Sequence, residues 1–556
     1  MKKIFLLFLS IFTINILNAQ SDYIQRGSEQ YNIINRLEIK LRTDSMLNFS
    51  SLQPFERKQI SERIEFLNDS NKLGHLNRID KYNLRMLSNN NFEWNSKIGD
   101  TIFTFKNGIK AYKSWKPAYA GIKTKDFSLF ATPLFSFQFG NDNNLDNGLF
   151  TNSRGILLRG SISNKIGFYS YFVENQERNP KYVNQWVEKF QALPGAGLIK
   201  SFSGNGFDFM DVRGGIMFKV TKGIDVQYAY DRVFIGNGYR SLILSDFAQN
   251  FLYLKINTRF WKLNYTNIFA QLNSSFIPGG SVLIPKKYMA LHYLDFKVNK
   301  WLNLGVFEHV IFGRQNGFDF NYLNPVIFYR AVEQQLGSKD KVTLGINVKA
   351  NAFKNTQFYG QLIINEFMLK EILNYKKGWW ANKQALQIGI KMIDLLKVKN
   401  LDLQLEANLV RPFTYSDKDS IGSFSHYNQP LAHPLGANFR EFICIVRAQP
   451  IPKLNIIAKL FYIEQGLDSA GFNMGNNILV PYETGRTRDY GFFIGTGSLA
   501  KSLMASITAS YEFLPNIYFD VNATIRRFSQ ENLPKFNTNI FSTGIRMNLG
   551  RREFEF

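Results

Sequence analysis

The sequence predicts an all-β transmembrane fold, an antiparallel outer-membrane β-barrel of about 18 strands with a small N-terminal α-helical periplasmic region. Three observations support this fold. The chain opens with the layout of a secretory signal. Beyond that signal it has no apolar run long enough for a spanning helix, although 45% of its residues are hydrophobic. Most of the chain alternates apolar with polar residues, which is typical of strands.

Residues 1–20, MKKIFLLFLSIFTINILNAQ, combine two lysines, an apolar run and a small residue at Ala19, as a signal peptide does. No cysteine follows the expected cut, so we expect an exported chain without a lipid anchor. The remaining chain divides into a periplasmic helical region and lead-in over 21–125 and a transmembrane barrel over 126–556. We expect the N-terminal helices and the C-terminus on the periplasmic side of the outer membrane.

Two amphipathic helices are predicted in the N-terminal region. The first covers 51–67, where an early proline precedes apolar residues at helical spacing: Phe55, Ile60, Ile64 and Leu67. The second covers about 73–87, with one face formed by Leu76, Ile79, Tyr82 and Met86. These helices either stand beneath the barrel or plug its lumen.

The strands follow from period-two alternation. In LDLQLEANL, residues 401–409, the leucines and Ala407 point one way, while Asp402, Gln404, Glu406 and Asn408 point the other. One face suits lipid and the other suits water. The last segment alternates from Phe541 to Leu549 and is expected to end as a strand on Phe556, which resembles the terminal signal that barrel-insertion machinery reads.

The connections between strands fall into two classes that take turns, short periplasmic hairpins and long outer loops, as barrels require. The short class is expected at 164–165, 221–223, 299–300, 449–453 and 514–516. The long class is expected at 141–153, 174–212, 234–250, 313–340, 412–437 and 465–496.

Several chemical functions find no support in the sequence. Cys444 is the only cysteine, which excludes an internal disulfide, and the five histidines lack zinc spacing, so we expect no metal and no cofactor. NDNNLDNG at 141–148 lacks the glycine and glutamate positions of a calcium loop and is interpreted as a turn. No hydrolase elbow or phosphate-binding loop is present, so the chain is not expected to be an enzyme.

The formal net charge of +23 predicts an attraction to polyanions. An exported barrel does not meet nucleic acid, so the expected partners are lipopolysaccharide phosphates and acidic surface polysaccharide, besides outer-membrane lipid. The alternative is that the lysines and arginines are solvated groups of the rims and lumen.

Two outer loops mix aromatic, basic and amide side chains, the combination that stacks on sugar rings and bonds hydroxyl or carboxylate groups. The first contains GNGYRSLILSDF at 236–247, where the glycines suit a positive-φ turn. The second contains FNYLNPVIFYRAVE at 320–333. The alternative for both is an inward cap in which the loops pack against each other and Leu242 to Leu244 pack onto the barrel mouth.

GNGYRSLILSD with the following FLYLKI, and the later NPVIFYRAVE, resemble outer-membrane proteins of the Wzi-type capsule assembly family, in the branch described as gliding-motility outer-membrane proteins. The resemblance implies an 18-stranded barrel with a periplasmic helical bundle and a lectin-like role in attaching or organising capsular polysaccharide. The positions that would carry over as ligand-binding residues are Asn237, Tyr239, Arg240, Ser241, Asp246, Asn324, Tyr329, Arg330 and Glu333.

The leading hypothesis is therefore a non-enzymatic barrel that binds, anchors or assists export of surface polysaccharide. In this hypothesis the arginines contact uronate or phosphate groups, the tyrosines stack, and the asparagines bond hydroxyls. One alternative is a component or partner of gliding-motility or surface-protein secretion machinery. A further alternative is an anion-selective diffusion channel.

Overall fold

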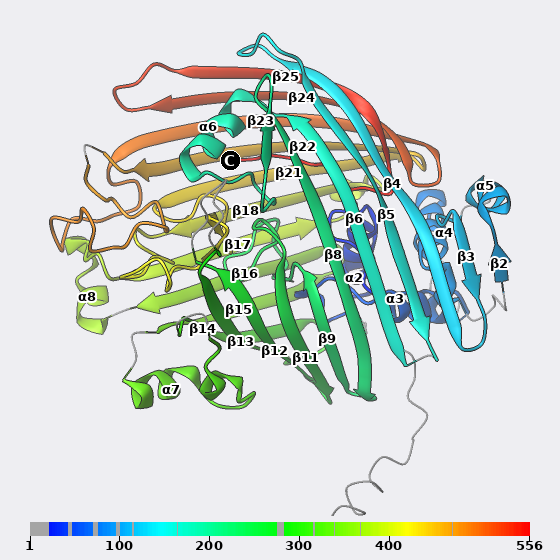
Figure 1. The fold of residues 1–556 in the computed structure, drawn as a ribbon, viewed down its shortest axis with the longest axis horizontal. Coiled ribbons are helices and arrows are strands. Elements are labelled where there is room, and N and C mark those ends of the chain that lie inside the picture. The colour runs from blue at the N-terminus through cyan, green and yellow to red at the C-terminus, as the bar shows by residue number, and fades with distance from the viewer. Residues whose placement is uncertain are drawn as a thin grey trace, which may run out of the picture.

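The computed structural model describes residues 22–42, 47–69, 76–95, 101–113, 116–163, 165–274, 283–314, 317–337, 340–366, 368–469 and 471–556. The predicted signal peptide lies outside these residues, as does the start of the second predicted helix. The described chain forms one closed barrel with the N-terminal helices at one end and the long loops, which include α6 (Lys181–Phe190), α7 (Tyr329–Leu336) and α8 (Leu369–Leu373), at the other (Figure 1).

Eighteen strands form the barrel wall, which confirms the predicted fold class. They are β4 (Phe127–Asp142), β5 (Leu149–Ile162), β6 (Ile166–Arg178), β8 (Gly206–Thr221), β9 (Ile224–Asp231), β11 (Phe251–Phe260), β12 (Leu263–Asn273), β13 (Lys286–Lys297), β14 (Leu302–Phe312), β15 (Lys341–Phe353), β16 (Thr356–Glu366), β17 (Lys383–Met392), β18 (Leu401–Val410), β21 (Phe439–Ile451), β22 (Leu454–Leu467), β23 (Ser498–Leu514), β24 (Ile517–Gln530) and β25 (Phe536–Met547).

Each wall strand pairs antiparallel with its neighbours, and β25 closes the circle on β4 from Phe135 to Asp142. Closure leaves no free strand edge, as a spanning sheet in lipid requires. Short strands lie outside the wall. β2 (Thr101–Phe103) pairs with β3 (Ala120–Lys123), which pairs with the start of β4, and β7 (Lys200–Phe202) pairs with the start of β8. β19 (Ser425–His426) and β20 (Gln429–Pro430) pair with each other.

Connections alternate between a turn end and a loop end, as predicted. The turn end carries 163–165, 222–223, 261–262, 298–301, 354–355, 393–400, 452–453 and 515–516. The loop end carries 143–148, 179–205, 232–250, 274–285, 313–340, 367–382, 411–438, 468–497 and 531–535. One expected long loop is wrong: 141–153 is mostly strand, and its connection spans only 143–148, because the pairing of Gly140 with Leu149 continues the β4–β5 hairpin.

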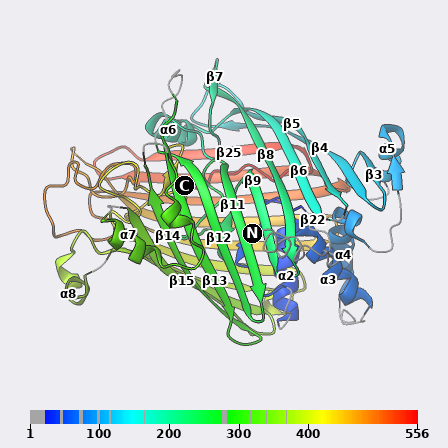
Figure 2. The same ribbon diagram turned by 60° about the horizontal axis from the view of Figure 1, so that its bottom comes forward.

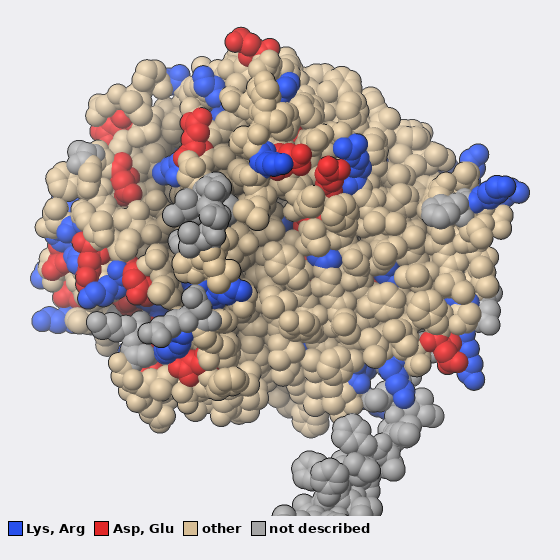
Figure 3. Space-filling view, viewed as in Figure 1, with Lys and Arg blue, Asp and Glu red and all other residues tan. Residues whose placement is uncertain are grey.

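The outer face of the wall is apolar. In β18 the polar residues Gln404, Glu406 and Asn408 are buried on the inner face, while Leu405 is exposed on the outer face, as the alternation predicts. Other exposed outer residues include Val306, Ile346, Ile388 and Ile525. Figure 3 shows a broad band with few charged side chains across this face and charged groups gathered mainly toward its ends. The band suits the hydrocarbon core of a membrane.

Helices precede the wall. They are α2 (Gln30–Leu41), α3 (Arg57–Asp69), α4 (Arg78–Asn90), η1 (Phe92–Trp94) and α5 (Phe105–Lys113). Within the described residues, no helix is long and apolar enough to cross a membrane.

The first predicted helix begins later than expected, at Arg57, because Leu52 and Gln53 form strand β1 (Leu52–Gln53) against β10 (Phe234–Ile235). Its predicted face of Phe55, Ile60, Ile64 and Leu67 is buried, as expected.

In α4 the side chain of Asn77 accepts hydrogen bonds from the amides of Ile79 and Asp80 and caps the start of the helix. The buried face runs through Leu84 and Leu87 as well as Met86, so the predicted face is only partly right. Helix α2 was not expected from the sequence.

The N-terminal region closes the turn end and enters the lumen. Glu38 of α2 pairs with Lys349 on the inner face of β15 at 2.7 Å, with both side chains buried. Glu93 pairs with Arg159 of β5 at 2.6 Å, and Tyr82 donates to Glu512 of β23. The second predicted helix, α4, therefore stands at the turn end, whereas the contact of Glu38 with Lys349 shows that α2, which was not among the predicted helices, reaches the inner face of the wall.

The C-terminal segment differs from the expectation. The last strand ends at Met547, and residues 548–556 do not continue it, so the expected strand ending on Phe556 is wrong. Asn548 lies at the turn end, where its amide bonds the carbonyl of Asn516, whereas Phe556 packs against Tyr182 and Trp186 at the loop end. The segment therefore runs back through the lumen, and in Figure 1 the C-terminus lies beside α6. The expectation that the N-terminal helices and the C-terminus share one side is wrong, because α4 contacts the turn end and Phe556 lies at the loop end.

Candidate functional site

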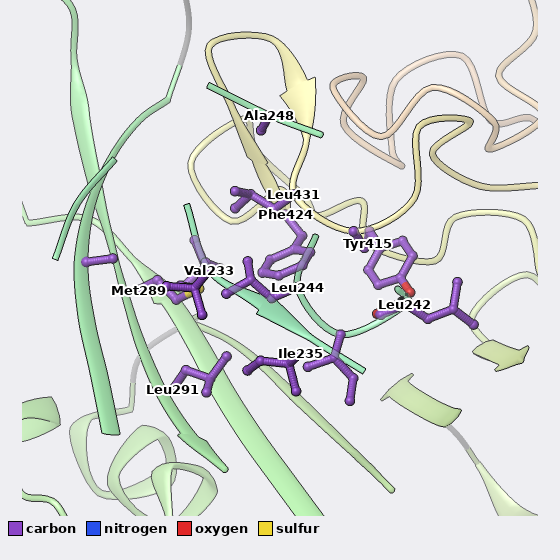
Figure 4. Close-up of a cluster of buried hydrophobic side chains, with 14 of the residues drawn as sticks. Val233, Ile235, Leu242, Leu244, Ala248, Met289, Leu291, Tyr415, Phe424 and Leu431 are labelled. Atoms are coloured by element: carbon purple, nitrogen blue, oxygen red, sulfur yellow. Dashed lines mark hydrogen bonds between the residues drawn. The ribbon is translucent and has the colours of Figure 1, made fainter. Parts of the chain in front are cut away.

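The connection 232–250, between the fifth and sixth wall strands, folds into the lumen. Leu242, Ile243 and Leu244 are fully buried against inner residues of β12 to β14, including Ile268 and Leu291. Figure 4 shows this cluster, in which Leu242, Leu244, Tyr415 and Phe424 approach one another. The apolar triplet thus fills part of the barrel interior, which is deeper than the capped mouth expected from the sequence.

This loop meets the N-terminal segment inside the barrel. The amide of Gly236 donates to the carbonyl of Ser51, and the Ser51 hydroxyl donates to Asn237 at 2.7 Å. Gly236 has a φ of 148°, and a Cβ here would lie 2.6 Å from Gln361 Nε2. The expected positive φ is thus confirmed for Gly236 but not for Gly238, whose φ is not positive. Two segments far apart in sequence therefore form one plug.

The five residues predicted in this loop have structural partners. Ser241 is buried; its hydroxyl donates to the carbonyl of Ile235 and accepts from the amides of Ile243 and Leu244. Asn237 is buried between Ser50 and Ser51.

The other three line a luminal cavity of about 440 Å³. Tyr239 donates to Glu555, and Arg240 pairs with Glu441 at 3.4 Å. Asp246 pairs with Arg26 at 2.9 Å. Burial opposes ionisation of Asp246, but the neighbouring guanidinium groups of Arg26 and Arg232 together outweigh it and lower the pKa of that carboxyl.

The four residues predicted in the second loop lie on the other side of the wall. Tyr329 packs on the outer face, where its hydroxyl bonds His292 of β13. Asn324 and Arg330 are exposed, and Arg330 pairs with Glu333 at 2.7 Å. The barrel wall separates this set from the first, so the two loops do not pack against each other as the alternative cap required.

A second cavity, of about 570 Å³, opens at the loop end. One side is α6 (Lys181–Phe190), in the connection between β6 and β8. Tyr182, Trp186 and Phe190 follow one another at a spacing of four residues, which puts them on one helix face. The Trp186 and Phe190 ring centroids lie 4.6 Å apart, and Phe556 stands 5.9 Å from Trp186.

The opposite side of this cleft comes from β24, where Arg526, Phe528 and Gln530 point to the same face because they are two residues apart. The Arg526 guanidinium carbon lies 4.9 Å from the Phe528 ring centroid and 4.7 Å from that of Tyr182. The lining also contains amide side chains, Gln465, Asn476 and Asn477, together with Lys189 and aliphatic residues such as Leu435 and Ile478.

Burial raises the pKa of Tyr182, so its hydroxyl stays a neutral donor, and it bonds the Phe554 carbonyl at 2.6 Å. The cleft thus holds aromatic faces beside amides and one deep guanidinium. The sequence analysis does not predict this cleft, because it interprets 174–212 only as a long connection. The aromatic spacing in KYVNQWVEKF was the signal that could have found it.

No protein-family model matches the chain, and no curated protein matches it in sequence. Among solved structures, the chain is similar to Wzi, an outer-membrane protein involved in group 1 capsule assembly in Escherichia coli and described as a carbohydrate-binding β-barrel. The identity is 12%, the match covers 96% of this chain and 99% of that one, and the TM-score is 0.56.

It also matches OprD of Pseudomonas aeruginosa at 9% identity, over 76% of this chain and 94% of that one, with a TM-score of 0.42. The likeness to Wzi supports the expected fold, an outer-membrane type of barrel. The gliding-motility branch stays a prediction.

Proposed function

We propose that this protein is a non-enzymatic outer-membrane barrel that binds surface polysaccharide in the cleft between α6 and β24, with its loop end facing the cell exterior. The observation that carries the proposal is the aromatic and amide lining of the 570 Å³ cleft at the loop end. The carbohydrate binding described for Wzi, which has the same fold, is consistent with it.

The cleft chemistry suits a sugar chain. Trp186 and Phe528 offer ring faces to the apolar faces of sugar rings, and Asn476, Asn477 and Gln530 offer both donors and acceptors to hydroxyl groups. Arg526 would contact a carboxylate or phosphate substituent through its planar fork. A cleft open on one side accepts a segment within a long chain, whereas a closed pocket would accept only its end.

Binding is tested by titrating the purified protein with surface polysaccharide extracted from the cells that produce it. We expect Trp186→Ala to weaken binding at least tenfold, equivalent to about 1.4 kcal/mol. The matched control is Trp261→Ala, whose side chain is 72% exposed in the turn 261–262 at the opposite end of the barrel. Unchanged affinity in a folded Trp186→Ala variant would refute the assignment.

The same titration separates the cleft from the residues that the resemblance implies. If those residues held the sugar, the double variant Arg240→Ala, Arg330→Ala would lose affinity while Trp186→Ala kept it. If the protein instead served as a diffusion channel, the wild type would conduct anions in a planar bilayer. The lumen is occupied by the segment around α2, the connection 232–250 and the C-terminal residues 548–556. Their presence favours polysaccharide binding over diffusion through the barrel.

A further inference from the structure

Part of the connection 313–340 lies flat against the outside of the barrel wall. We call residues 318–336 the outer flap; it contains η2 (Phe320–Leu323) and α7 (Tyr329–Leu336). Tyr322, Tyr329 and Val332 are buried against outer residues of β12 to β14, including Phe269 and Val310. Figures 1 and 2 both draw α7 outside the wall, beside β13 and β14.

The strand β14 shows what the outer flap covers. Leu304 and Val306 are 38% and 45% exposed on the outer face, as lipid-facing residues are. Glu308, Val310 and Phe312 continue the same face, because side chains alternate, yet all are buried. The outer flap therefore replaces lipid over the second half of this strand.

Beneath the flap lies a row of polar residues on the outer face. Asn267, His292 and Glu308 stand opposite one another on adjacent strands. A carboxylate facing hydrocarbon would be very costly unless it were hydrogen-bonded. Here Glu308 accepts the amides of Tyr329 and Arg330, both at 2.9 Å, and so caps the first turn of α7.

Two backbone groups between η2 and α7 are also paired. Tyr265 of β12 donates its hydroxyl to the carbonyl of Pro325, and the Asn324 side chain accepts the amide of Val326. Backbone that is satisfied in this way tolerates an apolar surrounding. The outward side of the flap carries three large apolar side chains, Phe320, Val326 and Phe328, which are 77%, 78% and 77% exposed. The exposed polar residues of the flap are Asn321, Asn324, Arg330, Gln334 and Gln335.

We propose that the outer flap is a membrane-embedded element that binds the acyl chains of outer-membrane lipid through Phe320, Val326 and Phe328. Its face is continuous with the apolar band formed by Val306 and Ile346, which already faces lipid. In this arrangement Arg330, 60% exposed at its side chain, extends toward the headgroups. The proposal does not depend on polysaccharide binding in the cleft.

Spin labels test the proposal. Cys444, the free cysteine, is changed to serine, and single cysteines are introduced by Phe328→Cys and, independently, Val326→Cys. Ile388→Cys, at a residue 56% exposed on the wall, is the lipid control, and Glu483→Cys, at an exposed charged position in 468–497, is the water control. Each labelled protein is placed in nanodiscs, and collisions with oxygen and with a water-soluble nickel chelate are measured.

We expect the labels at 326 and 328 to match the label at 388, with frequent oxygen collisions and at least fivefold fewer nickel collisions than at 483. Nickel access equal to that at 483 would overturn the proposal, because the flap would then face water. Protection from both reagents would also overturn it, since a second protein surface, such as another copy of this chain, would then cover the flap.

Discussion

Replacing Leu244 by alanine should loosen the inner plug by a measurable factor. Leu244 is fully buried in the lumen cluster, and a Leu→Ala change at such a site costs about 2–5 kcal/mol. If the connection 232–250 opens as a local unit, its opening equilibrium should rise between roughly 30-fold and several thousand-fold, because each 1.4 kcal/mol is a factor of ten.

Hydrogen exchange measures this change directly, since the amides of 242–248 exchange through local opening. Their protection should fall by the predicted factor in Leu244→Ala, while protection of β22 stays constant. Leu336→Ala is the matched control, because Leu336 is 40% exposed on the outer flap and its truncation should alter stability by less than about 0.5 kcal/mol. Unchanged protection of 242–248 in Leu244→Ala would refute the idea that burial of the triplet holds the loop in the lumen.

Two further variants test the plug and the outer flap. Lys349→Met leaves Glu38 buried without its cation and should destabilise docking of α2 by about 3–5 kcal/mol. The loss should be seen as faster proteolysis of residues 22–57. The double variant Lys349→Met, Glu38→Leu should recover most of the lost stability. Glu308→Ala leaves two amides of α7 without an acceptor and should cost about 1–3 kcal/mol, seen as lost amide protection over 328–334. Glu333→Ala removes an ion pair whose arginine side chain is 60% exposed, and it should leave this protection within twofold.

The wall could be predicted because its signals are local. Alternation in β18 and the short turns around 222–223 and 515–516 depend only on neighbouring residues. The plug could not, because it is built from contacts between distant segments, such as Ser51 with Asn237. One local trace of it exists: in β13, Met289 and Leu291 face inward and are as apolar as outward Tyr288 and Ala290. The loss of alternation in β13 indicates that apolar groups cover both of its faces, those of the plug on the inside and those of the outer flap on the outside.

The candidate site was predicted less well than the wall, for a physical reason. Tyr239 and Arg240 have the chemistry of a sugar contact, but the same groups serve equally in ion pairs and hydrogen bonds inside a plug. Composition does not distinguish the two uses; only the direction in which a loop folds does. The cleft residues Trp186 and Phe528 come from connections and strand ends whose proximity depends on barrel closure.

The net charge illustrates a similar limit and bears on the rival functions. An excess of +23 over the chain suggested a basic, anion-selecting lumen. The described lining of the 440 Å³ luminal cavity instead holds six guanidinium groups and six carboxylates: Arg26, Arg213, Arg232, Arg240, Arg551 and Arg552 with Glu29, Asp211, Asp231, Asp246, Glu553 and Glu555. Several form close pairs, such as Arg213 with Asp211 at 2.6 Å. The balanced lining gives this cavity no strong field for passing anions, and part of the excess positive charge lies elsewhere on the inner face, at Lys287 and Lys349. Anionic polysaccharide or lipid would then be attracted to the ends of the barrel, where the charged groups gather, and a polymer held in the loop-end cleft would need no path through the lumen.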